Sequence, residues 1–217
     1  MQSMTPLPAE ATALLEFWFA DAHASPAAAR RRVEIWFGHH PEFDAALRAR
    51  FGEWPARALR DEFTHWRATP RGTLALLVVL DQLPRNVHRG SPLAYACDAA
   101  ALALASEAEA VDLAAGLAPI EVPFCYLPFE HAEALEIQHR CIAAYERELA
   151  RAAAGYEWLF RECLREAHNH CDLIARYGRF PHRNAILGRA STPAELAYLA
   201  DGGRHWHQQA PASPTLS

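Results

Sequence analysis

Apolar residues recur at helical spacing along almost the whole chain, and no segment shows the strict alternation of a half-buried strand. In the segment from Pro41 to Phe51, for example, Phe43, Leu47 and Phe51 share one helix face. This pattern predicts an all-α fold of about eight or nine helices. We expect one helical domain over residues 1–200, followed by a loose tail over residues 201–217, which is rich in Gly, Gln, Pro and Ser.

Proline and polar residues predict where several helices begin and end. Residues 73–83 are apolar on every side until Asp81, which predicts a central buried helix that Pro84 ends or kinks. Residues 129–151 and 155–177 are predicted to form two long helices. Thr192 and Glu195 have the spacing of a capping box and predict the start of a short last helix.

Composition excludes several classes of function. The formal net charge is −5, which argues against a nucleic-acid partner. All 21 basic residues are arginine, so no lysine is present to form a Schiff base. The five cysteines show no paired spacing and are read as reduced thiols. The N-terminus lacks a signal-peptide pattern and the longest apolar run is far too short to cross a membrane, so we expect a cytoplasmic protein with no membrane partner.

An arginine-rich segment near the C-terminus is the strongest candidate for chemistry. Arg176, Arg179, Arg183 and Arg189 lie within a stretch that contains no Asp or Glu. Guanidinium groups without local counter-charge require an anion or a carboxylate from elsewhere in the fold.

Polar residues also interrupt apolar helix faces elsewhere. His131 and Gln138 lie on the inward seam predicted for residues 129–151, and His170 lies on that of residues 155–177. Asp81 follows seven apolar residues. Because burial of unpaired charge is costly, we expect these groups to meet one another. They form either a structural polar network or a ligand site, and we favour the ligand site because so many ionisable groups exceed what packing requires.

Four sequence blocks are distinctive: LLEFWF at residues 14–19, LALLVVLDQLPRNVHRG at 74–90, YLPFEHAE at 126–133, and HCDLIARYGRFPHRNAILGR at 170–189. Through these blocks the chain resembles the bacterial family called domain of unknown function 924. The resemblance implies a tetratricopeptide-repeat-like stack of antiparallel helix pairs, although the repeat's signature spacing is absent here. It implies no activity, but it does imply that the residues of these motifs belong together.

Our first hypothesis is a pocket for a small anionic molecule, a carboxylate or phosphate, with possible acid–base catalysis. The candidate catalytic residues are His131, His170, Asp81 and Glu133. The candidate ligand-binding residues are Gln82, Arg85, Asn86, Arg89, Gln138, Arg176, Arg179, His182, Arg183, Asn184 and Arg189. No motif for a nucleophile or a phosphate-binding loop is present.

Two alternatives remain. A helical-repeat scaffold without enzymatic activity can bind a peptide in a concave groove, where Arg or Asn holds the terminal carboxylate. A metal site from His131, His170 and either Asp81 or Glu133 is the weakest alternative, because no two of these residues have a helical chelating spacing. We therefore expect no metal and no cofactor.

Overall fold

Helices make up all the regular structure of residues 6–38 and 40–203, which are the residues that the computed structural model describes. The prediction of an all-α fold is confirmed. Nine helices of this part have eight or more residues: α1 (Ala9–Phe19), α2 (Pro26–Phe37), α3 (Pro41–Phe51), α5 (Pro70–Leu77), α7 (Asp98–Ala110), α8 (Pro123–Glu130), α9 (Leu135–Ala150), α10 (Glu157–Tyr177) and α11 (Pro193–Ala200). Two shorter helices are α4 (Trp54–Leu59) and α6 (Leu83–Val87).

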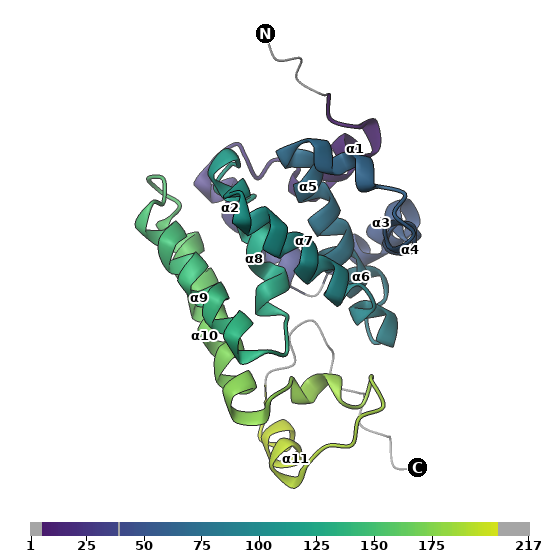
Figure 1. Cartoon of the computed structure of the whole chain (residues 1–217), viewed down its shortest axis with the longest axis vertical. Coiled ribbons are helices and arrows are strands. Elements are labelled where there is room, and N and C mark those ends of the chain that lie inside the picture. The colour runs from purple at the N-terminus through teal and green to yellow at the C-terminus, as the bar shows by residue number, and fades with distance from the viewer. Residues whose placement is uncertain (1–5, 39, 204–217) are drawn as a thin grey trace.

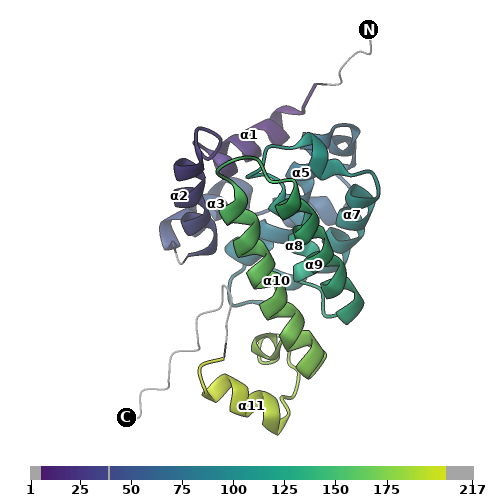
Figure 2. The same cartoon turned by 90° about the vertical axis from the view of Figure 1, so that its left-hand side faces the viewer.

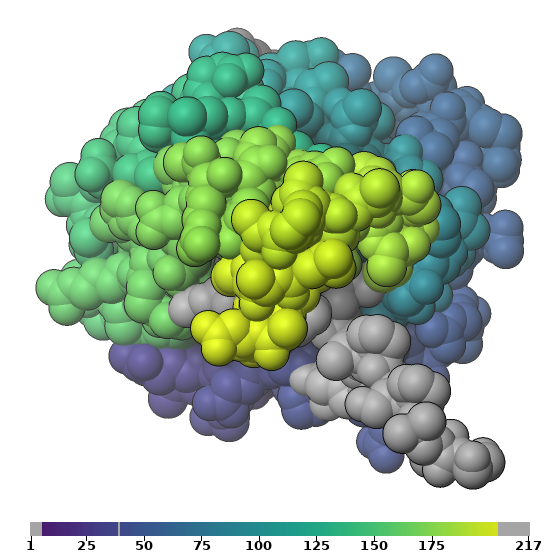
Figure 3. Space-filling view, turned by 90° about the horizontal axis from the view of Figure 1, so that it is seen from below, coloured from purple at the N-terminus to yellow at the C-terminus, as the bar shows by residue number. Residues whose placement is uncertain are grey.

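The two longest helices, α9 and α10, run antiparallel along one side of the molecule (Figures 1 and 2). Helix α8 packs between this pair and the layer that contains α5 and α7. Helix α11 lies beyond the C-terminal end of α10, and seen from below it forms the front of the molecule (Figure 3). The tetratricopeptide-like stacking remains a prediction, as does the single domain. In the described part of the chain, no helix has both the length and the apolar character that crossing a bilayer requires.

Aromatic side chains join the first two helices to α8. The rings of Trp18 and Trp36 are stacked with centroids 5.8 Å apart, and Phe124 meets Trp36 edge-on at 4.9 Å. All three side chains are almost fully buried. Since aromatic pairs in these geometries add to the free energy of burial, this cluster holds α2 against α8.

The buried helix predicted for residues 73–83 has a different internal structure. The α-helix ends at Leu77, and residues Val78–Gln82 form a π-helical turn that continues directly into α6. Pro84 lies in the first turn of α6, directly after the π-turn. Pro84 therefore does not end the helix, and a kink at Pro84 remains a prediction. The π-turn brings Asp81 and Gln82 into the interior, and such turns are frequent at functional sites.

The long helix predicted for residues 129–151 is two helices. Helix α8 ends at Glu130, and α9 begins at Leu135. His131 is therefore the C-terminal cap of α8 and does not lie on the seam of α9, which corrects our prediction. The capping box of Thr192 and Glu195 at the start of α11 is confirmed.

Candidate functional site

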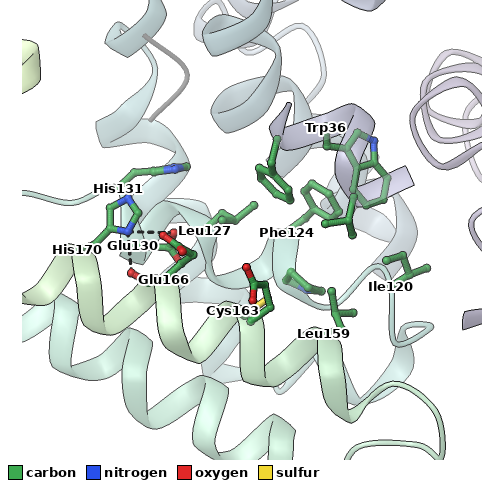
Figure 4. Close-up of a pocket in the computed structure, with 14 residues that line it drawn as sticks. Trp36, Ile120, Phe124, Leu127, Glu130, His131, Leu159, Cys163, Glu166 and His170 are labelled. Atoms are coloured by element: carbon green, nitrogen blue, oxygen red, sulfur yellow. Dashed lines mark hydrogen bonds and ion pairs between the residues drawn. The ribbon is translucent and has the colours of Figure 1, made fainter. Parts of the chain in front are cut away.

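A pocket of about 310 Å³ lies between α2, α8 and α10. Most of its wall is apolar or aromatic, and Glu130, His131, Glu166 and His170 lie together at one end (Figure 4). The apolar wall consists of Val33, Trp36, Phe37, Ile120, Pro123, Phe124, Leu127, Leu159 and Cys163, and the polar lining consists of Glu130, His131, Glu162, Glu166 and His170.

Helical spacing explains why these side chains share one cavity. Phe124, Leu127 and His131 are three and four residues apart, so they project from the same side of α8 and its cap. On α10, the lining residues at the same spacing are Leu159, Cys163, Glu166 and His170. They face α8 in the same way. The pocket is therefore a seam between two helices that α2 closes on one side.

Asp81 orients His131 at the polar end. The Nδ1 atom of His131 lies 2.7 Å from Oδ1 of Asp81, and Nε2 of Gln82 donates to Oδ2 at 2.5 Å. Arg85 donates from Nη1 to the Asp81 carbonyl oxygen at 2.6 Å and lies 3.4 Å from Oδ1. The structure thus brings together three residues of one motif with the predicted histidine.

The protonation states of Asp81 and His131 follow from the groups that surround them. Burial alone raises the pKa of Asp81, but the charge of Arg85 and the hydrogen bonds from His131 and Gln82 outweigh it, so the pKa of Asp81 is lowered and the carboxylate stays ionised. Burial, and next the charge of Arg85, lower the pKa of His131, which makes its imidazole neutral at pH 7. An ionised carboxylate only accepts hydrogen bonds, so Nδ1 of His131 carries the proton and Nε2 has a free lone pair.

His170 and Glu130 form the second half of the polar end. Nδ1 of His170 donates to the carbonyl oxygen of Glu166 at 2.8 Å and lies 3.3 Å from Oε1 of Glu130. The rings of His131 and His170 are 6.3 Å apart. Burial lowers the pKa of His170 well below its ordinary value, and burial raises the pKa of Glu130 well above its own. A neutral imidazole base, His131, and a protonated carboxylic acid, Glu130, therefore line one pocket.

The protonated Glu130 predicts a particular pH dependence. The folded chain keeps this proton at pH values where an exposed glutamate has lost it, so the contribution of Glu130 to the free energy of unfolding decreases as the pH rises above about 4.3. Glu130→Gln removes the titration and keeps a neutral side chain of the same shape. We expect its melting temperature to fall less than that of the wild type between about pH 5 and pH 8.

The matched control is Glu136→Gln, which makes the same substitution on the exposed face of α9 and should follow the wild-type pH dependence. Identical pH dependence in Glu130→Gln and the wild type would contradict a buried, protonated Glu130.

Two arginines lie behind His131 and share one carboxylate. Nη2 of Arg85 is 2.9 Å from Oδ1 of Asp98, and Nη1 of Arg183 is 3.3 Å from Oδ2. Arg183 also packs against the rings of Tyr95 and Phe180. Its Nε atom is buried without a hydrogen-bond partner among the described residues. Sequence analysis missed Asp98, which lies in the first turn of α7, because no motif residue lies beside it in the sequence.

Arg179 and Arg189 of the late segment are paired away from the pocket. Arg179 donates to both carboxylate oxygens of Glu195, at 2.6 and 2.8 Å. Arg189 contacts both oxygens of Glu133, at 2.6 and 3.0 Å, and Glu133 also accepts from the backbone N–H of Phe180. Glu133 thus anchors the late segment and is not a pocket-lining carboxylate.

The remaining predicted residues lie around the site or apart from it. Asn86 and Arg89 both bind Asp44 on α3, at 2.8 and 2.9 Å. Asn184 bonds to Ser191 and to Arg189. Gln138 is fully buried below the turn after α8. The ring of His182 packs near Phe180. Arg176 lies exposed over the Tyr177 ring.

Sequence analysis also missed Glu130 and Glu166, which line the pocket. The spacing of Phe124, Leu127 and His131 was the available signal, but the assumption of a helix running on from residue 129 obscured it. In the described ranges, no group of three or more His, Cys, Asp or Glu side chains has an arrangement that could hold a metal ion.

Comparison with known proteins identifies relatives but no activity. The family model described as a bacterial protein of unknown function (DUF924) matches residues 14–203. The chain is also similar to a solved structure, that of a protein of unknown function from Agrobacterium tumefaciens, with 34% sequence identity and a TM-score of 0.73. That match covers 89% of this chain and 98% of the other. None of the curated proteins matches.

Proposed function

The chain belongs to this bacterial family of unknown function, and because that membership assigns no activity, we propose a function from the geometry of the pocket. The pocket binds a small molecule that has an apolar body and one polar end. The body packs against α2 and α8, and the polar end meets Glu130, His131 and His170. The observation that carries this proposal is the segregation of the lining into an aromatic wall and a titratable end.

The polar end is suited to moving a proton. Nε2 of His131 accepts one, because Asp81 holds the opposite ring nitrogen as a donor. Glu130 donates one, because burial raises its pKa and keeps it protonated. A neutral imidazole base and a carboxylic acid whose pKa burial raises, in one pocket, support acid–base chemistry on the bound molecule.

An anionic ligand, a carboxylate or phosphate, is the second candidate. It is favoured by Arg85 and Arg183, which share Asp98 beside His131, and by the unpartnered Nε of Arg183. Against it, Arg179 and Arg189 are already engaged by carboxylates. The peptide-binding scaffold has less support, because Asn86 and Asn184 bond within the chain.

Filling the pocket tests the proposal. Val33 is a partly exposed lining residue on α2, so Val33→Phe places a ring in the cavity with little strain elsewhere. We expect 1-hexanol to raise the melting temperature of the wild type in a dose-dependent way, and to have at least tenfold weaker effect on Val33→Phe.

The control is Glu34→Phe, which adds the same ring to the exposed side of α2. It should respond to hexanol as the wild type does. If hexanol stabilises Val33→Phe as strongly as the wild type, the pocket is not the binding site.

A further inference from the structure

We propose that the polar end of the ligand is an ammonium group, held between the carboxyl group of Glu130 and Nε2 of His131. The ligand class is then an amphipathic amine whose hydrocarbon or aromatic body lies on Trp36 and Phe124. This inference rests on the proposed function, because it requires that the pocket bind a small molecule.

The first step is the hydrogen-bonding capacity of His131 and Glu130. Nδ1 of His131 donates to Asp81, so the ring can offer a ligand only the Nε2 lone pair. Oε1 of Glu130 lies beside the N–H of His170, and when ionised the carboxyl group has only acceptor sites. A ligand group with several N–H donors satisfies both residues, whereas an ionised carboxylate has no proton to give them.

The second step is charge. The described lining contains Glu130, Glu162 and Glu166, and it contains no arginine. At the rim, Arg165 pairs with both glutamates of α10, which leaves the lining acidic overall once Glu130 ionises. The buried guanidiniums of Arg85 and Arg183 are both directed at carboxylates outside the lining. A cation is therefore the complementary ligand charge.

The third step is the proton of Glu130. Burial raises the pKa of this carboxyl group well above its ordinary value, because a buried carboxylate without a counter-charge is poorly solvated. An ammonium ion supplies the missing counter-charge and lowers its pKa. Glu130 then gives its proton to bulk water and pairs, as a carboxylate, with the intact ammonium ion. One proton is released for each ammonium ion bound, and no covalent bond of the ligand changes.

The experiment compares hexylamine, 1-hexanol and hexanoate, which share one body and differ in the polar group. Isothermal titration calorimetry near pH 6, in two buffers of different ionisation enthalpy, gives the affinity and the number of protons released. With the wild type, we expect hexylamine to bind at least tenfold more tightly than hexanoate and to release close to one proton.

Glu130→Gln should bind hexylamine at least tenfold more weakly and release no proton, whereas the exposed control Glu136→Gln should keep both properties of the wild type. Hexanoate binding as tightly as hexylamine overturns the inference, and so does hexylamine binding that Glu130→Gln leaves intact. If hexanol binds and hexylamine binds no better, only this inference fails. If none of the three binds, the proposed function fails with it.

Discussion

Asp81→Asn is expected to lower the free energy of unfolding by about 3 kcal/mol, the largest effect of any single polar substitution at the site. The carboxylate of Asp81 is almost fully buried and offsets the charge of Arg85 while it accepts from His131 and Gln82. Asparagine removes the charge and leaves the Arg85 guanidinium with Asp98 as its remaining carboxylate. Urea unfolding at pH 7 measures the loss.

Asp172→Asn is the matched control, because Asp172 is exposed on α10, and its effect should stay within about 0.5 kcal/mol. A loss below about 1 kcal/mol for Asp81→Asn would show that the buried charge pair contributes little to stability.

A second measurement determines which ring nitrogen of His131 is protonated. In ¹⁵N spectra of the wild type, His131 should carry its proton on Nδ1, and Asp81→Asn should weaken that preference because the amide can also donate.

Gln138→Leu should cost about 2 kcal/mol of unfolding free energy. Gln138 is fully buried, and its Nε2 donates to the carbonyl oxygens of Phe129, Glu130 and Ala132 at 3.2, 2.8 and 2.7 Å. Leucine has a similar volume but no donor. The Oε1 atom of Gln138 lacks a hydrogen-bond partner in the described chain, so losing that atom offsets part of the cost.

The same substitution should weaken binding in the pocket. The carbonyls held by Gln138 belong to the turn that presents Glu130 and His131, so loosening the turn misplaces both groups. We expect at least a threefold loss of hexanol affinity in Gln138→Leu by thermal shift. His139→Leu, an exposed neighbour on α9, is the control and should match the wild type. Unchanged stability and affinity in Gln138→Leu would contradict this role.

Local sequence was sufficient where the controlling interaction is itself local. The predicted helix from Pro41 to Phe51 is present with those bounds, and the Thr192 capping box forms as expected. It was insufficient near residue 130. Pro128 lies inside α8 without ending it, and the break comes instead at the turn that Gln138 stabilises through three hydrogen bonds. These side chain–backbone bonds span six to nine residues and leave no periodic trace in the sequence.

The sequence by itself determined that the chain is helical, and that Asp81, His131 and His170 need partners, because apolar spacing and the cost of buried charge are local properties. Only the tertiary structure decided the partners. Arg189 meets Glu133 at a separation of 56 residues, and Arg183 meets Asp98 at 85. The physical reason is that an ion pair depends on the distance between two side chains, which the packing of helices sets and local sequence does not encode.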